Sequence, residues 1–143
     1  RIIKECEYYT PMEAQVGMGE DGNKKDAVRS SIVRWVNGKD QNSKFIYDLI
    51  WNYADQANRI AFGVDIREIY DIQYTIYDSK DEGHYDEGGN FLLDSQYEAP
   101  NPESLRKKGT VLVFPSTISH KVEKVTKGVR KSLVAWIEGP KWR

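Results

Sequence analysis

Apolar residues recur at steps of three and four positions between residues 42 and 60. This spacing places them on one face of an α-helix. Ser43 stands where an N-cap residue is expected. The pattern therefore predicts an amphipathic helix that lies on a hydrophobic core. Its apolar positions are Phe45, Ile46, Leu49, Ile50, Tyr53, Ala54 and Ala57.

Four other stretches are typical of β-strands, because β-branched and aromatic residues are frequent in them and polar residues partly alternate with apolar ones. They are residues 28–36, 69–77, 110–114 and 132–138. Turn-forming Gly, Pro, Asp and Asn residues separate the later strands. Residues 17–29 are rich in glycine and charge, so we expect a surface loop there.

The order of these elements indicates the fold class. No helix of convincing length interrupts the strands of the second half, which argues against a parallel βαβ sheet. We expect an all-β core with a flanking helix (α+β), arranged as an antiparallel sandwich or barrel. A chain of 143 residues is the length of a single domain, so we expect residues 1–143 to form one.

Charge and composition exclude several partners. The 21 basic and 22 acidic residues nearly cancel, and no basic run is interleaved with aromatics, so we expect no nucleic acid partner. The chain has neither a long apolar stretch nor the layout of a signal peptide, so we expect no membrane partner and a cytoplasmic location. The single cysteine, Cys6, excludes an internal disulfide.

The two histidines are candidate metal ligands. His84 and His120 each lie beside a predicted strand. Two histidines and a carboxylate form the usual non-haem iron(II) site, which leaves positions open for a bidentate keto acid and dioxygen. A lone histidine is more often a surface or packing residue, so each needs partners to support this interpretation.

Arg130 is a candidate for anion binding. In a strand, two-residue alternation places Arg130, Ser132, Val134 and Trp136 on one face. An arginine among inward apolar residues is costly unless it meets an anion. Its guanidinium offers two parallel donors to a carboxylate, and the Ser132 hydroxyl can add a third hydrogen bond. A surface strand with a solvated Arg130 is the alternative that spacing alone leaves open.

Residues 114–142 resemble the end of the prolyl-4-hydroxylase-like 2-oxoglutarate oxygenases, a family with bacterial and phage members. In that family a Phe-Pro-Ser turn precedes the second iron-binding histidine, a later arginine binds 2-oxoglutarate, and a strand ending in Trp closes the barrel. His120, Arg130 and Trp136 stand at these positions. The resemblance implies a double-stranded β-helix, a jelly roll of the cupin type. A phage-encoded protein acting in the host cytoplasm is consistent with it.

The family's first iron motif, His-x-Asp, is where this chain departs. His84, Tyr85 and Asp86 match it literally, yet the stretch from His84 to His120 is short for several barrel strands and their turns. The run that ends at Asp86 instead resembles the start of a family sequence that leads into the motif. The Glu-Gly-Gly that begins at Glu87 resembles a turn found some strands later. We therefore expect that a segment is missing between Asp86 and Glu87.

The resemblance also implies a ligand set and a reaction. His120 would bind iron(II), with His84 and Asp86 as further ligands if the literal motif holds, and Arg130, Tyr77 and Ser132 would bind 2-oxoglutarate. Dioxygen would be the second cosubstrate and ascorbate an optional reductant. The dioxygenase would hydroxylate an unactivated carbon, by family analogy that of a prolyl residue in a peptide or protein.

Two other functions stay open. A non-catalytic jelly-roll binding module would result if the first iron motif is truly lost. A metal-independent sugar-binding or cupin-like sandwich fits the strands and the scattered Trp and Tyr residues, but it leaves the spacing of His120 and Arg130 unexplained. An encoded His-x-Asp between Asp86 and Glu87 would separate the enzyme from the binding module.

Overall fold

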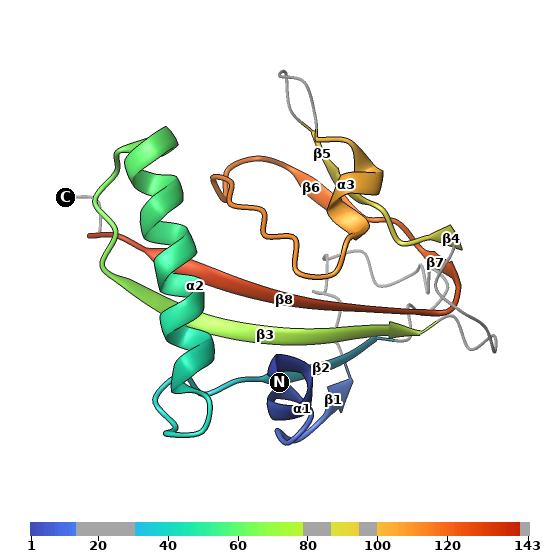
Figure 1. The fold of residues 1–143 in the computed structure, drawn as a ribbon. Coiled ribbons are helices and arrows are strands. Elements are labelled where there is room, and N and C mark those ends of the chain that lie inside the picture. The colour runs from blue at the N-terminus through green and yellow to red at the C-terminus, as the bar shows by residue number, and fades with distance from the viewer. Residues whose placement is uncertain (14–30, 79–86, 95–99, 141–143) are drawn as a thin grey trace, which may run out of the picture.

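A four-stranded antiparallel sheet is the largest element of the computed structural model, which describes residues 1–13, 31–78, 87–94 and 100–140 (Figure 1). The strands lie in the order β1-β2-β3-β8. β3 and β8 pair along nearly their whole length, from Glu68 opposite Glu138 to Asp78 opposite Val129. The strands are β1 (Met12–Glu13), β2 (Ser31–Trp35), β3 (Glu68–Asp78) and β8 (Val129–Glu138).

Two small antiparallel sheets and three helices complete the described part of the chain. One small sheet pairs β4 (Glu87–Gly88) with β7 (Val125–Lys127), and the other pairs β5 (Phe91–Leu93) with β6 (His120–Val122). The helices are α1 (Ile2–Cys6), α2 (Lys44–Ala57), which continues into the π-helical turn η1 (Asn58–Phe62), and α3 (Pro102–Arg106).

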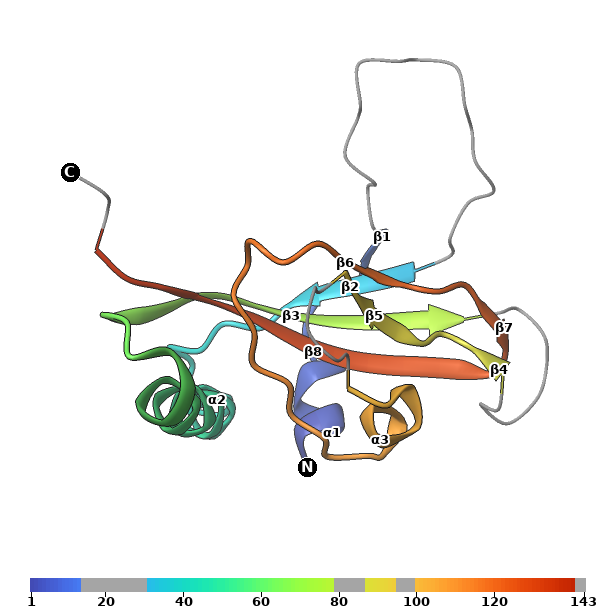
Figure 2. The same cartoon turned by 90° about the horizontal axis from the view of Figure 1, so that it is seen from above.

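The main sheet has two faces of different character. Helices α1 and α2 lie on the same side of it, as Figure 2 shows, and their apolar residues meet the sheet in the core. We call this the core face and the opposite one the distal face. By alternation the distal face carries Gln73, Thr75 and Tyr77 of β3 and Arg130, Ser132, Val134 and Trp136 of β8. The main cluster of buried residues consists of Cys6, Val36, Ile46, Ile69, Ile72 and Tyr74.

The predicted helix is confirmed, with one difference at its start. Helix α2 begins after Ser43, as expected, but the Ser43 side chain makes no capping bond to the helix. Its hydroxyl instead donates to the carbonyl of Asn37 at 2.5 Å and accepts from the Tyr9 hydroxyl at 2.8 Å. Ser43 is fully buried, so a carbonyl of the preceding turn and the Tyr9 hydroxyl replace the capping bond.

Three of the four predicted strands are confirmed in the described residues, as β2, β3 and β8. The prediction of a strand at 110–114 is wrong. There the Thr110 amide donates to the Lys107 carbonyl at 3.0 Å, and the Phe114 ring packs against Phe91 and His120. Side-chain packing therefore holds this stretch without a strand ladder. The predicted loop at 17–29 lies outside the described residues.

Antiparallel sheets with flanking helices thus agree with the predicted fold class. None of the helices in the described ranges is long and apolar enough to cross a membrane.

A polar cluster ties α1 to the core face. The Lys131 ammonium donates to Oε1 of Glu7 at 2.8 Å, and the Tyr74 hydroxyl donates to the same oxygen at 3.3 Å. The hydrogen bond from Lys131 lowers the pKa of Glu7. Burial, with the nearby Glu7 carboxylate, raises the pKa of Tyr74 to about 12, so Tyr74 stays a neutral donor.

Truncating the core at α2 should be costly. Ile46 is fully buried, so we expect Ile46→Ala to lower the free energy of unfolding by about 2 to 5 kcal/mol. Ile60 is 87% exposed, and Ile60→Ala should change the free energy of unfolding by less than about 0.5 kcal/mol. Urea denaturation measures both values, and equal effects would contradict the assignment of the core.

The Glu7 cluster should make stability depend on pH. The pKa of Glu7 is lower in the folded state than in the unfolded state. The carboxylate therefore contributes its full stabilisation above the unfolded-state pKa, and this stabilisation is lost as pH falls through the folded-state pKa. We expect Glu7→Gln and Lys131→Met to reduce the loss of stability between about pH 6 and pH 3, measured by urea denaturation. An unchanged pH profile in both variants would refute this role.

Candidate functional site

The ladder between β3 and β8 brings three predicted site residues together. Arg130 lies directly opposite Tyr77, and Ser132 lies opposite Thr75. Directly opposed residues share a face, so all four are on the distal face. The guanidinium carbon of Arg130 lies 5.4 Å from the centroid of the Tyr77 ring, within the range of a cation–π contact. The aromatic ring therefore helps to fix the position of the guanidinium.

The guanidinium of Arg130 is incompletely satisfied. Its Nη1 is buried and has no hydrogen-bond partner within the part of the chain that the structure describes. An unpaired buried donor costs about 1 to 3 kcal/mol, more when it is charged, and such groups need an explanation. A carboxylate bound at this position would accept from the guanidinium. The residues here fit the distal carboxylate of a 2-oxo dicarboxylic acid.

Two residues next to the pair of Arg130 and Tyr77 on the distal face are buried. Thr75, beside Tyr77 on the same face of β3, is 2% exposed, and Val33, opposite it on β2, is 6% exposed. Thr75 is not among the site residues predicted from the sequence, although alternation from Tyr77 places it on this face. A shielded position strengthens the interaction of a guanidinium with an anion.

The imidazole ring of His120 is held by a carbonyl contact and by two aromatic rings. His120 begins β6, and its Nδ1 lies 3.0 Å from the carbonyl oxygen of Ile118. A carbonyl only accepts hydrogen bonds, so Nδ1 carries the proton and Nε2 keeps its lone pair. Its ring also packs edge-on against Phe114, with centroids 5.0 Å apart, and lies 5.7 Å from the ring of Phe91. A fixed ring with a free Nε2 fits one ligand position of iron(II).

The described residues do not complete a metal centre. No group of three or more His, Cys, Asp or Glu side chains that could hold a metal occurs in the described ranges. His84, Tyr85 and Asp86 lie outside those ranges, so the literal motif and the missing segment before Glu87 stay predictions. His120 belongs to the sheet formed with β5, whereas Arg130, Tyr77 and Ser132 belong to the main sheet.

The unpaired donor of Arg130 predicts that this residue serves binding more than stability. We expect Arg130→Met to leave the free energy of unfolding of the ligand-free protein unchanged, or to raise it by about 1 kcal/mol, because it removes the unsatisfied Nη1. Urea denaturation without ligand measures this. A loss of several kcal/mol would mean that Arg130 is a structural residue.

Comparison with known proteins gives the family. The family model of the 2OG-Fe(II) oxygenase superfamily matches residues 55–138. A PKHD-type hydroxylase of Synechococcus sp. (strain CC9311) is 46% identical over 52 residues, which are 36% of this chain and 23% of that protein. A PKHD-type hydroxylase of Prochlorococcus marinus is 35% identical over 99 residues, 65% of this chain and 42% of that protein.

No solved structure matches the chain. The chain spans less than half the length of either of these relatives. The family model nevertheless covers more than half of the chain, in a range that contains Tyr77, His120, Arg130 and Ser132. The resemblance to prolyl-4-hydroxylase-like oxygenases is thereby confirmed, and the chain belongs to the 2OG-Fe(II) oxygenase superfamily.

Proposed function

We propose that this chain is the catalytic domain of an iron(II)- and 2-oxoglutarate-dependent dioxygenase that hydroxylates a prolyl residue of a peptide or protein. The observation that carries the proposal is the buried, unpaired Nη1 of Arg130 beside Tyr77 on the distal face. The main sheet and the small sheets would be the two walls of a double-stranded β-helix, and residues 1–143 would form one domain. Hydroxylation is supported by the names of both relatives.

Three residues would hold 2-oxoglutarate. The Arg130 guanidinium would donate to the carboxylate far from the metal, through the nitrogen that now lacks a partner. Ser132, half-buried on the same strand face, would donate its hydroxyl to that carboxylate. Tyr77 would hold the guanidinium in place with its ring and donate its hydroxyl to the ligand. Charge and geometry then select a dicarboxylate over a monocarboxylate.

His120 would supply one iron ligand through Nε2. The others would be His84 and Asp86, or a His-x-Asp segment encoded between Asp86 and Glu87. When bound, iron(II) and 2-oxoglutarate together supply the oxidation of an unactivated C–H bond by dioxygen, and ascorbate would keep the iron reduced. The protein's own contribution is orientation and exclusion of water.

Anaerobic titration of the full expressed protein tests the proposal. Iron(II) and 2-oxoglutarate should together produce the weak visible charge-transfer band of a metal-bound 2-oxo acid. We expect the Arg130→Ala variant to show no band at the same 2-oxoglutarate concentration, because it lacks the guanidinium N–H groups that would donate to the carboxylate of 2-oxoglutarate. His120→Ala should lose it at the same iron concentration, because it removes a metal ligand.

Two variants control this titration. Arg67→Ala removes an arginine that pairs with Asp65 on the surface, and it should keep the band. Arg130→Lys keeps the charge but loses the planar pair of donors, so it should need more 2-oxoglutarate to reach the same absorbance. A flat spectrum from folded wild-type protein would refute the oxygenase and leave the non-catalytic binding module.

A further inference from the structure

Exposed aromatic residues gather on the distal face at the end of β3 and β8 away from Arg130. The rings of Trp35 and Trp136 lie 6.0 Å apart with their planes tilted by 34°. Trp35 is 44% exposed, Trp136 is 40% exposed, and the neighbouring Tyr70 is 65% exposed. We call Trp35, Tyr70 and Trp136 the aromatic platform. Large aromatic surfaces left open to water on one sheet face are typical of binding sites.

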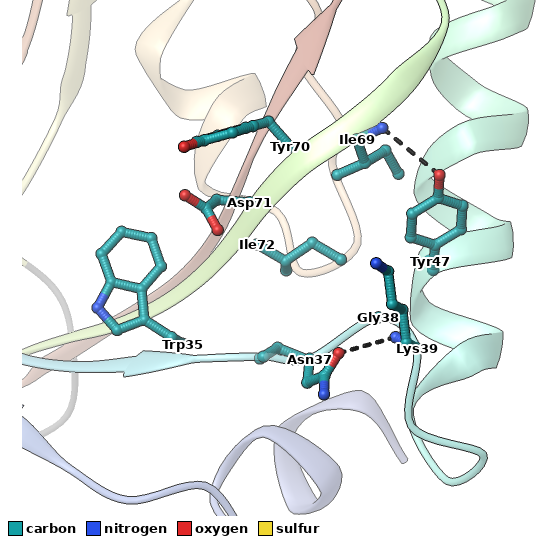
Figure 3. Close-up of a pocket in the computed structure, with 10 residues that line it drawn as sticks. Trp35, Asn37, Gly38, Lys39, Tyr47, Ile69, Tyr70, Asp71 and Ile72 are labelled. Atoms are coloured by element: carbon teal, nitrogen blue, oxygen red, sulfur yellow. Dashed lines mark hydrogen bonds between the residues drawn. The ribbon is translucent and has the colours of Figure 1, made fainter.

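A β-bulge creates part of this platform. The register between β3 and β8 shifts between Ile69 and Asp71, so Tyr70 is an extra residue in the ladder. Tyr70 and Asp71 therefore both point away from α2, on the side of Trp35, whereas Ile69 and Ile72 point toward α2 (Figure 3). Bulges often re-aim side chains next to functional sites.

A pocket adjoins the platform. It has a volume of about 280 Å³, and Trp35, Tyr70 and Asp71 are among the residues that line it (Figure 3). Lys39, across the pocket, is a basic lining residue. The carboxylate of Asp71 makes no hydrogen bond or ion pair within the part of the chain that the structure describes. The pocket thus combines aromatic surface with an available negative charge.

The charges around the platform are unbalanced. Glu68 and Glu138 lie directly opposite one another on the distal face, both exposed, next to Trp136 and Asp71. Like charges directly opposite in a sheet are destabilising. The nearby Arg67 lies 3.7 Å from Asp65 and so balances a different carboxylate. Asp71, Glu68 and Glu138 together outnumber Lys39 of the pocket, so the surface around the platform is complementary to a cation.

We propose that the aromatic platform binds a substrate segment in which the residue to be hydroxylated is flanked by lysine or arginine. A cation over an indole face is attracted by the ring, and the nearby carboxylates add to this attraction. The apolar face of a proline ring can pack on the same indole surface. The role of the platform as a substrate site rests on the proposed oxygenase function, but its preference for basic peptides does not.

The two ends of the distal face would then sort two ligands by charge. Arg130, with its unpaired donor, attracts an anion at one end, and Asp71, Glu68 and Glu138 attract a cation at the other. Arg130 and Trp136 are separated by about 20 Å of extended strand, enough for a bound dicarboxylate and a peptide to lie side by side. A basic peptide would gain no affinity from contact with Arg130, so the peptide and the dicarboxylate would not compete for the same end of the face.

Binding of two short peptides to the full protein, without iron or 2-oxoglutarate, tests this inference. Both are blocked at their ends, one with the sequence Gly-Lys-Pro-Lys-Gly and the other Gly-Glu-Pro-Glu-Gly, and tryptophan fluorescence reports their binding. We expect the lysine peptide to bind about tenfold more tightly or better. The preference should shrink as salt is raised, because exposed charges are screened.

Variants assign the preference to the platform. Asp71→Asn keeps the shape of the side chain but removes its charge. It should weaken binding of the lysine peptide about threefold or more and should not weaken binding of the glutamate peptide. Glu103→Gln on α3 removes an equal, exposed charge elsewhere and should change neither. Trp136→Leu should weaken both peptides, and an unchanged melting temperature shows that each variant is folded.

Equal affinity for the two peptides would overturn the inference. So would an affinity for the lysine peptide that is unchanged in both Asp71→Asn and Trp136→Leu. Failure of the oxygenase proposal is recognised separately, because the charge-transfer titration uses no peptide. A charge-transfer band without a peptide preference would support the oxygenase and refute the peptide site at the platform. A peptide preference with a flat spectrum would support a site for basic peptides and refute its role in an oxygenase.

Discussion

The register of the ladder between β3 and β8 is the constraint on which the rest of the structure depends. Side chains alternate along a strand, so a slip by one residue would turn Arg130 toward the core face and expose its apolar neighbours. The core prevents this slip, because Ile72 and Tyr74 of β3 are almost completely buried, with Leu133 of β8 packed against the same cluster. Hydrophobic burial on one face thus positions the polar residues of the other.

Two locally unfavourable features lie on the distal face. They are the unpaired Nη1 of Arg130 and the opposed carboxylates of Glu68 and Glu138. Proteins tolerate such features where function requires them, at the expense of stability. On the core face, by contrast, the Glu7 carboxylate is well satisfied by Lys131. The Nη1 of Arg34 on that face is also buried and has no partner among the described residues, and nothing in the structure explains it.

The candidate site combines residues from two sheets that the main ladder does not join. Arg130 and Tyr77 are fixed by strand pairing, whereas His120 is fixed by a carbonyl contact and by the rings of Phe91 and Phe114. The half of the candidate site that contains Arg130 and Tyr77 is therefore fixed by the ladder of the main sheet. The orientation of His120 instead depends on packing in the small sheet, so the two halves can respond differently to substitution.

The sequence by itself determined helix α2, strands β3 and β8, the shared face of Arg130 and Ser132, and the family. Local periodicity reports which face of an element is buried, and the spacing of His120 and Arg130 is a property of the chain alone. Only the tertiary structure decided that Tyr77 lies opposite Arg130, that a bulge at Tyr70 re-aims two side chains, and that residues 110–114 form no strand. Those features depend on pairing between residues far apart in the chain, and periodicity carries no information about which strands meet or in which register.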